Sequence, residues 1–178
     1  MFLLLFAGCG GRQTVFLNRE FNFQFVERVA VIPFDNLTGE KGAGARATRV
    51  FISELLATEA FDVVEPGEVT LALGKFSTLR TSELTTEQIK ELGKTLHVQG
   101  LFFGSVTESS TSRSGDASIN TVAMVVRLVE TETGETVWSA TGSSGGRGFW
   151  GPLFGGGGKP ASEVTRDCAR KILNTLVD

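Results

Sequence analysis

Short apolar runs alternate along the chain with amphipathic stretches, a pattern typical of α/β proteins. The continuous apolar run Val29–Phe34 predicts a strand buried on both faces. That strand should end at Pro33 or form a bulge there, because proline lacks the amide donor that a sheet ladder needs. The spacing of apolar residues predicts a helix over residues 43–60 and a second short strand over residues 61–65. The chain therefore opens with a parallel β-α-β unit.

Further along the chain, helix signals are followed by a change to strand periodicity. Pro66 suits the first turn of a helix that Gly74 ends, and Thr85–Gln88 has the pattern of a capping box that opens another helix. The other expected elements are strands at 100–106, 119–130 and 135–140, a solvated serine-rich loop at 108–118, a tight turn at 132–134, and a helix at 161–176. These predict a single-domain α/β sandwich whose mixed sheet has a parallel βαβ start and an antiparallel meander, flanked by helices.

Two aromatic segments are candidates for partner binding. Residues 21–25 alternate Phe with polar residues, which predicts a strand with three phenyl rings on one side. This strand either packs on the body of the domain or docks on a partner or a neighbouring subunit. The glycine-rich loop at 142–158 also carries large apolar residues, and it either covers the sheet edge or inserts into a partner or a membrane interface. The candidate partner-binding residues are Phe21, Phe23, Phe25, Phe149, Trp150 and Phe154.

The N-terminus has the features of an export signal. Residues 1–8 form an apolar run that is too short to span a bilayer, since a helix of this length reaches roughly 13 Å. The sequence Phe6-Ala7-Gly8-Cys9 resembles a bacterial lipobox, in which the cysteine is diacylated and becomes the new N-terminus. We therefore expect residues 1–8 to be the C-terminal part of a signal peptide, 9–20 a lipidated cysteine with a tether, and 21–178 the folded domain.

The composition argues against most catalytic chemistry. The 178 residues carry a formal charge of −3, which gives no electrostatic footprint for nucleic acid. One histidine, His97, and two cysteines leave little for a zinc cage, a disulfide framework or a catalytic triad. Cys168 falls on the apolar stripe of the last helix, where a thiol acts as a small hydrophobe. We expect no enzyme activity, no metal, and no cofactor beyond the diacylglycerol lipid on Cys9.

A nucleotide-binding alternative rests on three residues. Gly42 and Gly44 fit a GxGxxA pattern between a strand and a helix, and Glu65 lies near the spacing of a ribose-binding acid. However, seven residues separate Phe34 from Gly42. A loop of this length does not place the helix N-terminus over a pyrophosphate in the usual geometry.

Four segments in order, Val29–Gly39, Phe61–Glu65, Gly104–Thr107 and Arg127–Glu135, resemble the CsgG family of outer-membrane lipoproteins, the curli production assembly and transport components. The resemblance covers residues 26–178 and implies a periplasmic α/β domain on a lipid anchor, related in fold to LpoB and the N-terminal domain of TolB. The namesake forms a ring that exports curli subunits. A pore subunit needs amphipathic strands of about 9–11 residues, which residues 108–118 and 139–160 do not provide, so we expect no transmembrane barrel.

The resemblance implies a non-enzymatic, lipid-anchored protein that assembles or transports an envelope or surface structure through protein–protein contacts. Its partners would be the membrane, an envelope protein and further copies of itself. One alternative is an LpoB-like regulator of a peptidoglycan synthase. The other is the nucleotide-binding enzyme that uses Gly42, Gly44 and Glu65.

Overall fold

The computed structural model describes residues 13–76, 84–114, 117–145 and 158–177. Strands and helices alternate along the chain, with one 3-10 turn, η1, near the start. In chain order the elements are β1 (Val15–Leu17), η1 (Phe23–Phe25), β2 (Arg28–Val31), β3 (Asp35–Asn36), α1 (Ala43–Leu56), β4 (Asp62–Val63), α2 (Pro66–Leu73), α3 (Thr86–Leu96), β5 (Gly100–Ser114), β6 (Ala117–Glu130), β7 (Thr136–Gly145) and α5 (Ala161–Val177).

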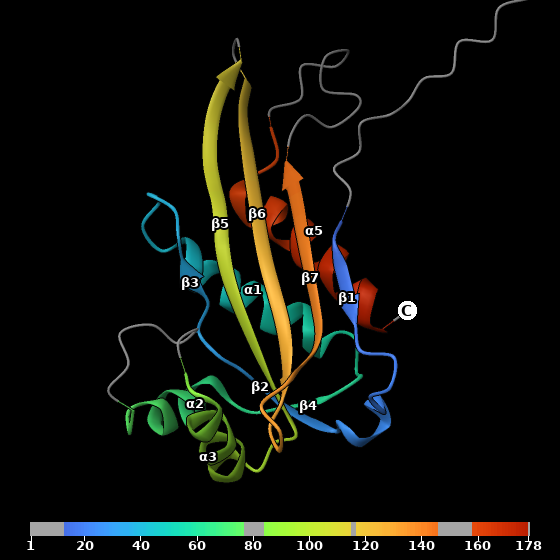
Figure 1. Cartoon of the computed structure of the whole chain (residues 1–178). Coiled ribbons are helices and arrows are strands. Elements are labelled where there is room, and N and C mark those ends of the chain that lie inside the picture. Colours follow the sequence, from blue (N-terminus) through green and yellow to red (C-terminus); the bar gives the residue numbers. More distant parts are fainter. Residues whose placement is uncertain (1–12, 77–83, 115–116, 146–157, 178) are drawn as a thin grey trace, which may run out of the picture.

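The strands form one open mixed sheet in the order β1-β7-β6-β5-β2-β4, with β3 also paired to β5 (Figure 1). β2 runs parallel to β4 and β5, whereas β5, β6, β7 and β1 are antiparallel neighbours. This arrangement confirms the predicted α/β class with a parallel start and an antiparallel meander.

Helices cover both faces of the sheet. α1 and α5 lie on one face, and α2 and α3 lie on the other face near its lower end (Figure 1). On the α1–α5 face, the Phe102 ring packs at 5.4 Å from Phe51 and 6.2 Å from Trp138, measured between ring centroids. Burial of such rings removes a large apolar area from water and holds the helices on the sheet. The core on the α2–α3 face includes Ile32, Leu92, Leu96, Leu101 and Phe103.

Local signals in the sequence set several boundaries. Pro66 is the first residue of α2, as its fixed φ and missing amide favour. The Thr85 hydroxyl accepts from the Gln88 amide at 3.3 Å, and the Gln88 side chain accepts from the Thr85 amide at 2.9 Å. This capping box opens α3 as predicted.

The serine-rich stretch is not a loop. Residues 107–114 continue β5 and pair with β6 as far as Ser114 opposite Ala117, so the prediction for 108–118 is wrong. We call residues 107–122, apart from the two at the tip that the structure does not describe, the β5–β6 arm. The register shifts between Val106 and Glu108, which marks a β-bulge at its base.

The N-terminal segments also differ from expectation. Val15–Leu17 form β1 on the edge of the sheet, so the folded domain begins before residue 21 and includes part of the expected tether. The expected strand at 21–25 is instead a 3-10 turn, because the Asn22 side chain caps the Gln24 amide at 3.0 Å and bends the chain. Among the described residues, no helix has the length and apolar character to cross a membrane.

Candidate interaction surfaces

The three N-terminal phenylalanines do not share one face. Phe21 and Phe23 are half-buried against the core, with their rings edge to face at 5.0 Å between centroids. Phe25 points away, with 74% of its surface exposed. Packing on the body of the domain is therefore correct for Phe21 and Phe23, while Phe25 is left as an exposed aromatic side chain.

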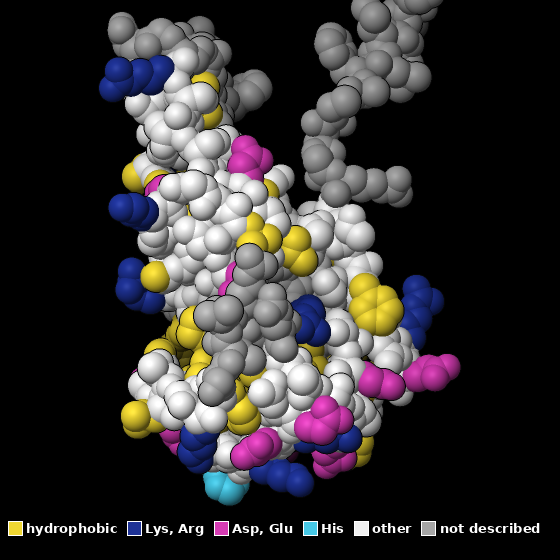
Figure 2. Space-filling model, turned by 60° about the vertical axis from the view of Figure 1, so that its left-hand side comes forward, with side chains coloured by type: hydrophobic (Ala, Val, Ile, Leu, Met, Phe, Trp, Pro, Cys, Tyr) yellow, Lys and Arg dark blue, Asp and Glu magenta, His cyan; other side chains and the backbone are white. Residues whose placement is uncertain are grey.

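An open groove of about 1110 Å³ lies beside Phe25, between α3 and the β6–β7 turn. Its walls carry charges of both signs, and charged side chains of both signs also gather at this lower end of the molecule in Figure 2. The charged and ionisable residues of the groove are Lys90, Lys94, His97, Glu130, Glu132 and Glu135. The Glu130 carboxylate accepts from the backbone amides of Glu132 and Thr133 at 2.5 and 2.8 Å, so it holds its own turn in place.

The edge strand β1 is apolar and exposed. Val15, Phe16 and Leu17 expose 44%, 51% and 44% of their surfaces, although they pair with β7 on their inner side. Within the part of the chain that the structure describes, no strand pairs with the outer side of β1. An edge strand without charge or proline is a favourable place for contact with another surface.

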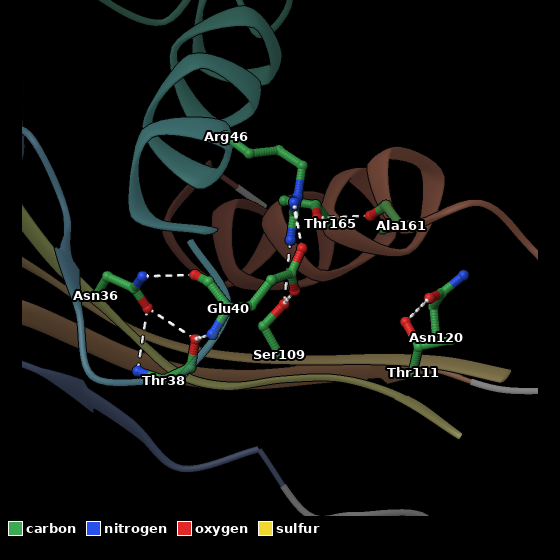
Figure 3. A network of polar contacts seen from close by, with 9 residues as sticks. All are labelled: Asn36, Thr38, Glu40, Arg46, Ser109, Thr111, Asn120, Ala161 and Thr165. Atoms are coloured by element: carbon green, nitrogen blue, oxygen red, sulfur yellow. Dashed lines mark hydrogen bonds and ion pairs between the residues drawn. The ribbon is translucent and has the colours of Figure 1, made fainter. Parts of the chain in front are cut away.

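The loop between β3 and α1 is held rigidly by side chains (Figure 3). Asn36 donates to the Glu40 carbonyl at 2.7 Å and accepts from the Thr38 amide at 3.0 Å and from its hydroxyl at 2.8 Å. These bonds close a side-chain-capped turn of the type that asparagine favours. The loop, whose first residues belong to the Val29–Gly39 segment that resembles the CsgG family, is therefore held in one conformation by its own side chains.

The same loop is joined to the β5–β6 arm by three side chains. Arg46 of α1 donates to one Glu40 oxygen at 2.8 Å and to the Ser109 hydroxyl at 3.0 Å, and Ser109 donates to the other Glu40 oxygen (Figure 3). The Arg46 hydrogen bond, with help from Ser109, lowers the pKa of the Glu40 carboxyl. The network couples α1, the loop and the arm.

The nucleotide-site residues have structural roles. Gly42 has a φ of 81°, which favours glycine where the chain enters α1. A Cβ on Gly44 would lie 2.5 Å from the Phe34 carbonyl oxygen, so glycine allows α1 to approach the strand. Glu65 is the residue before α2 and caps nothing with its side chain. Chain packing thus accounts for both glycines.

The other candidate reactive groups that the structure describes lie apart from one another. His97 is exposed at the C-terminal end of α3, and burial raises the pKa of the Cys168 thiol to about 11. Among the described residues, no three His, Cys, Asp or Glu side chains could hold a metal ion together. The Glu54 carboxylate, which the sequence did not single out, lies 3.5 Å from Arg166 and 2.5 Å from Arg170, and so links α1 to α5.

Four of the predicted site residues lie outside the described residues: Cys9, Phe149, Trp150 and Phe154. Their roles in lipidation and partner binding stay predictions. Two exposed features were missed from the sequence, the β1 edge and the groove beside Phe25. The β1 segment is only three residues long, which is too short to give a clear period.

Solved structures of bacterial proteins share this architecture. A PelC dodecamer from Paraburkholderia phytofirmans superposes with a TM-score of 0.64 at 20% identity, covering 92% of this chain and 96% of that one. Lipoprotein GNA1162 from Neisseria meningitidis gives a TM-score of 0.60 at 17% identity, covering 84% and 97%. This chain has their fold. Escherichia coli LpoB matches over 65% of this chain and 55% of its own, with a TM-score of 0.51 at 17% identity.

Sequence comparisons add nothing to this likeness. No family model matches the chain, and no curated protein sequence matches it. Membership of the CsgG family therefore stays a prediction, while the fold shared with PelC and with lipoprotein GNA1162 extends over nearly the whole chain.

Proposed function

We propose that this chain is a lipid-anchored protein on the periplasmic face of the outer membrane that acts in assembly or transport of an envelope structure. It works through protein contacts, further copies of itself among them, and not through catalysis. The observation that carries the proposal is the fold, shared almost end to end with a lipoprotein and with a protein that forms a dodecamer. The Phe6–Cys9 lipobox pattern supports the anchor.

Surface features support contact rather than chemistry as the mode of action. The exposed Phe25 offers area for a protein partner and the apolar β1 edge offers area for a partner or the membrane, whereas the Glu130 and Glu54 carboxylates hold a turn and two helices in place. Phe149, Trp150 and Phe154 are proposed as further partner contacts on the basis of their sequence alone. Aromatic residues of this kind dominate the energy of many protein interfaces.

The anchor is tested by fractionating cells and by mass spectrometry of the N-terminus. We expect the native protein in the outer-membrane fraction, beginning at a diacylated Cys9. Cys9→Ser should leave the protein unlipidated and out of the outer-membrane fraction, and Cys168→Ala, which changes the other cysteine, should keep the anchor. An unmodified Cys9 in the mature protein would overturn the proposal.

Self-association is tested by native mass spectrometry of the lipidated protein in detergent. A defined oligomer is the expected result, and a monomer at all concentrations would remove copies of this chain from the list of partners. Enzymatic function is tested by thermal-shift scans with NAD and ATP, in which we expect no stabilisation.

A regulator of a peptidoglycan synthase is the second candidate, favoured by the likeness to Escherichia coli LpoB. It predicts that the domain co-purifies with such a synthase and raises its glycan-polymerising rate. Failure of both effects with each synthase of the source organism would leave the assembly role as the proposal.

A further inference from the structure

The point where the chain enters the fold lies midway along one edge of the sheet. Thr14 is the first of the described residues that is tied to the sheet, since its carbonyl accepts from the Thr141 amide at 2.9 Å and its amide donates to the Thr141 hydroxyl at 3.1 Å. Thr141 lies opposite Val125 in the middle of β6. Any tether that precedes Thr14 is therefore attached at mid-height, and not at either end of the domain.

The tether to Cys9 is short. Five residue steps separate Cys9 from Thr14, and a fully extended chain covers at most about 18 Å over that number. With a lipid on Cys9, as the proposed function has it, Thr14 must lie within this distance of the headgroup layer. That layer is itself only about 5–7 Å thick on each side of a bilayer.

The end of the sheet that carries the β5–β6 arm cannot point straight at the bilayer under this constraint. From Val125 to Ala117 near the tip of the β5–β6 arm, eight residue steps span about 27 Å. If the arm pointed at the membrane, its polar tip would reach about 27 Å beyond the level of Thr14, whereas Cys9 reaches at most about 18 Å beyond it. The tip would then lie about 9 Å deeper in the membrane than Cys9. The arm carries serines, threonines and Arg113, which are costly to bury in hydrocarbon.

The tether would let the opposite end of the sheet reach the depth of Cys9, and the charge of that end is what disfavours this orientation. From Thr141 to Thr136, five residue steps span about 17 Å, and the β6–β7 turn and α3 extend the molecule further. That end carries many of the charged side chains in Figure 2. The remaining orientation places the strands along the membrane plane with the β1 edge downward.

The β1 edge has the chemistry that this orientation needs. It is an apolar strand without a charged residue, and its three side chains are the exposed hydrophobic cluster closest to the tether. Lys171 of α5 reaches the Ser143 carbonyl at 3.2 Å, which puts a cation on β7 two residues beyond Thr141. Phenyl and aliphatic side chains beside a cation suit the interface of an anionic bilayer.

We infer that the lipidated protein lies on the membrane with the β1 edge, Val15–Leu17, seated in the lipid interface and its strands close to the membrane plane. The inference rests on the proposed anchor at Cys9. What it adds is the identity of the membrane-facing surface and the orientation of the domain.

Site-directed fluorescence on the full-length lipidated protein tests this orientation. Phe16→Cys is labelled with a small fluorophore, and Leu17→Cys serves as a second reporter in the same strand. Cys168 is buried and does not compete for the reagent. The matched control is Leu71→Cys on α2, which is 79% exposed and lies near the opposite edge of the sheet.

Each labelled protein is reconstituted into vesicles of phosphatidylethanolamine and phosphatidylglycerol that contain brominated acyl chains. We expect quenching by bromine to be several-fold stronger at positions 16 and 17 than at position 71, with the reverse order for aqueous iodide. Equal quenching at all three positions in a sample whose lipid is confirmed by mass spectrometry would overturn the orientation alone.

Two other outcomes also decide against it. Shielding of position 16 from iodide without quenching by bromine would mean that a second copy or another protein covers the edge. An unmodified Cys9 would remove the tether constraint, and the proposed function and the orientation would fall together.

Discussion

The contact between α3 and the β6–β7 turn predicts that a Gly→Ala substitution in the helix destabilises the protein, although this substitution ordinarily stabilises a helix. Gly93 is buried within α3, and a Cβ at this position would lie 2.5 Å from the Thr131 Cβ and 2.8 Å from its Cγ2. Thr131 is itself fixed, since its hydroxyl donates to the Val98 carbonyl at 2.8 Å. Gly→Ala in a helix normally stabilises by about 1 kcal/mol. Here overpacking should cost about 1–3 kcal/mol, which leaves Gly93→Ala destabilised by up to about 2 kcal/mol.

Gly67 in α2 provides the matched control, because a Cβ there would meet nothing within 4 Å. Gly67→Ala should therefore stabilise the protein, by up to about 1 kcal/mol. Urea unfolding followed by circular dichroism at 222 nm measures both changes from the shift in midpoint at constant slope. If Gly93→Ala gained stability as Gly67→Ala does, the tight packing of α3 against Thr131 would be refuted.

Three further changes test other parts of the structure. Gly44→Ala should lower the free energy of unfolding by about 1–3 kcal/mol in the same urea assay, because the new Cβ meets the Phe34 carbonyl; an unchanged midpoint would contradict this close approach. Glu40→Gln should cost less than about 1 kcal/mol, since the pair is partly solvated. The pKa of Glu40 is lowered in the folded state. The loss of stability caused by Glu40→Gln should therefore be fully present above the ordinary glutamate pKa of about 4.3 and vanish as the pH falls through the lowered value. Thermal melts of both proteins from pH 7 to pH 3 would show this change. The Cys168 thiol, with its pKa raised to about 11, should resist alkylation at pH 8 in the native protein and react readily in urea; fast native labelling would argue against its burial.

Signals that act over one or two turns of chain predicted their elements well. Pro66 and the capping box at Thr85 set the starts of α2 and α3, and the apolar stripe through Val164, Cys168 and Ile172 predicted α5. The caps act through residues close in sequence, and the stripe of α5 repeats at the helical period, so both patterns are visible in the chain itself.

Elements that depend on distant partners were missed. Residues 108–114 are rich in serine, which favours turns and loops locally, but pairing with β6 satisfies their backbone groups and extends β5. One miss has a local cause: the alternating phenylalanines at 21–25 suggested a strand, but the Gln24 amide donates to the Asn22 side chain, which favours a turn. The β1 edge was also missed, because β1 is a strand only through its pairing with β7, more than a hundred residues away in the sequence. No local pattern indicates such a pairing.

The β-bulge at Thr107 determines which side chain faces Glu40. Because of the extra residue, Glu108 lies opposite Ala123 and Ser109 lies opposite Val122, on the side of the sheet that α1 covers. If the ladder continued from Val106 without the bulge, Thr107 would lie opposite Ala123 and Glu108 opposite Val122. A carboxylate would then approach Glu40 where a hydroxyl now donates to it, and two like charges would compete for the single guanidinium of Arg46. The bulge, which leaves Thr107 out of the ladder, thus puts a point of attachment between helix and arm where a regular ladder would place two like charges.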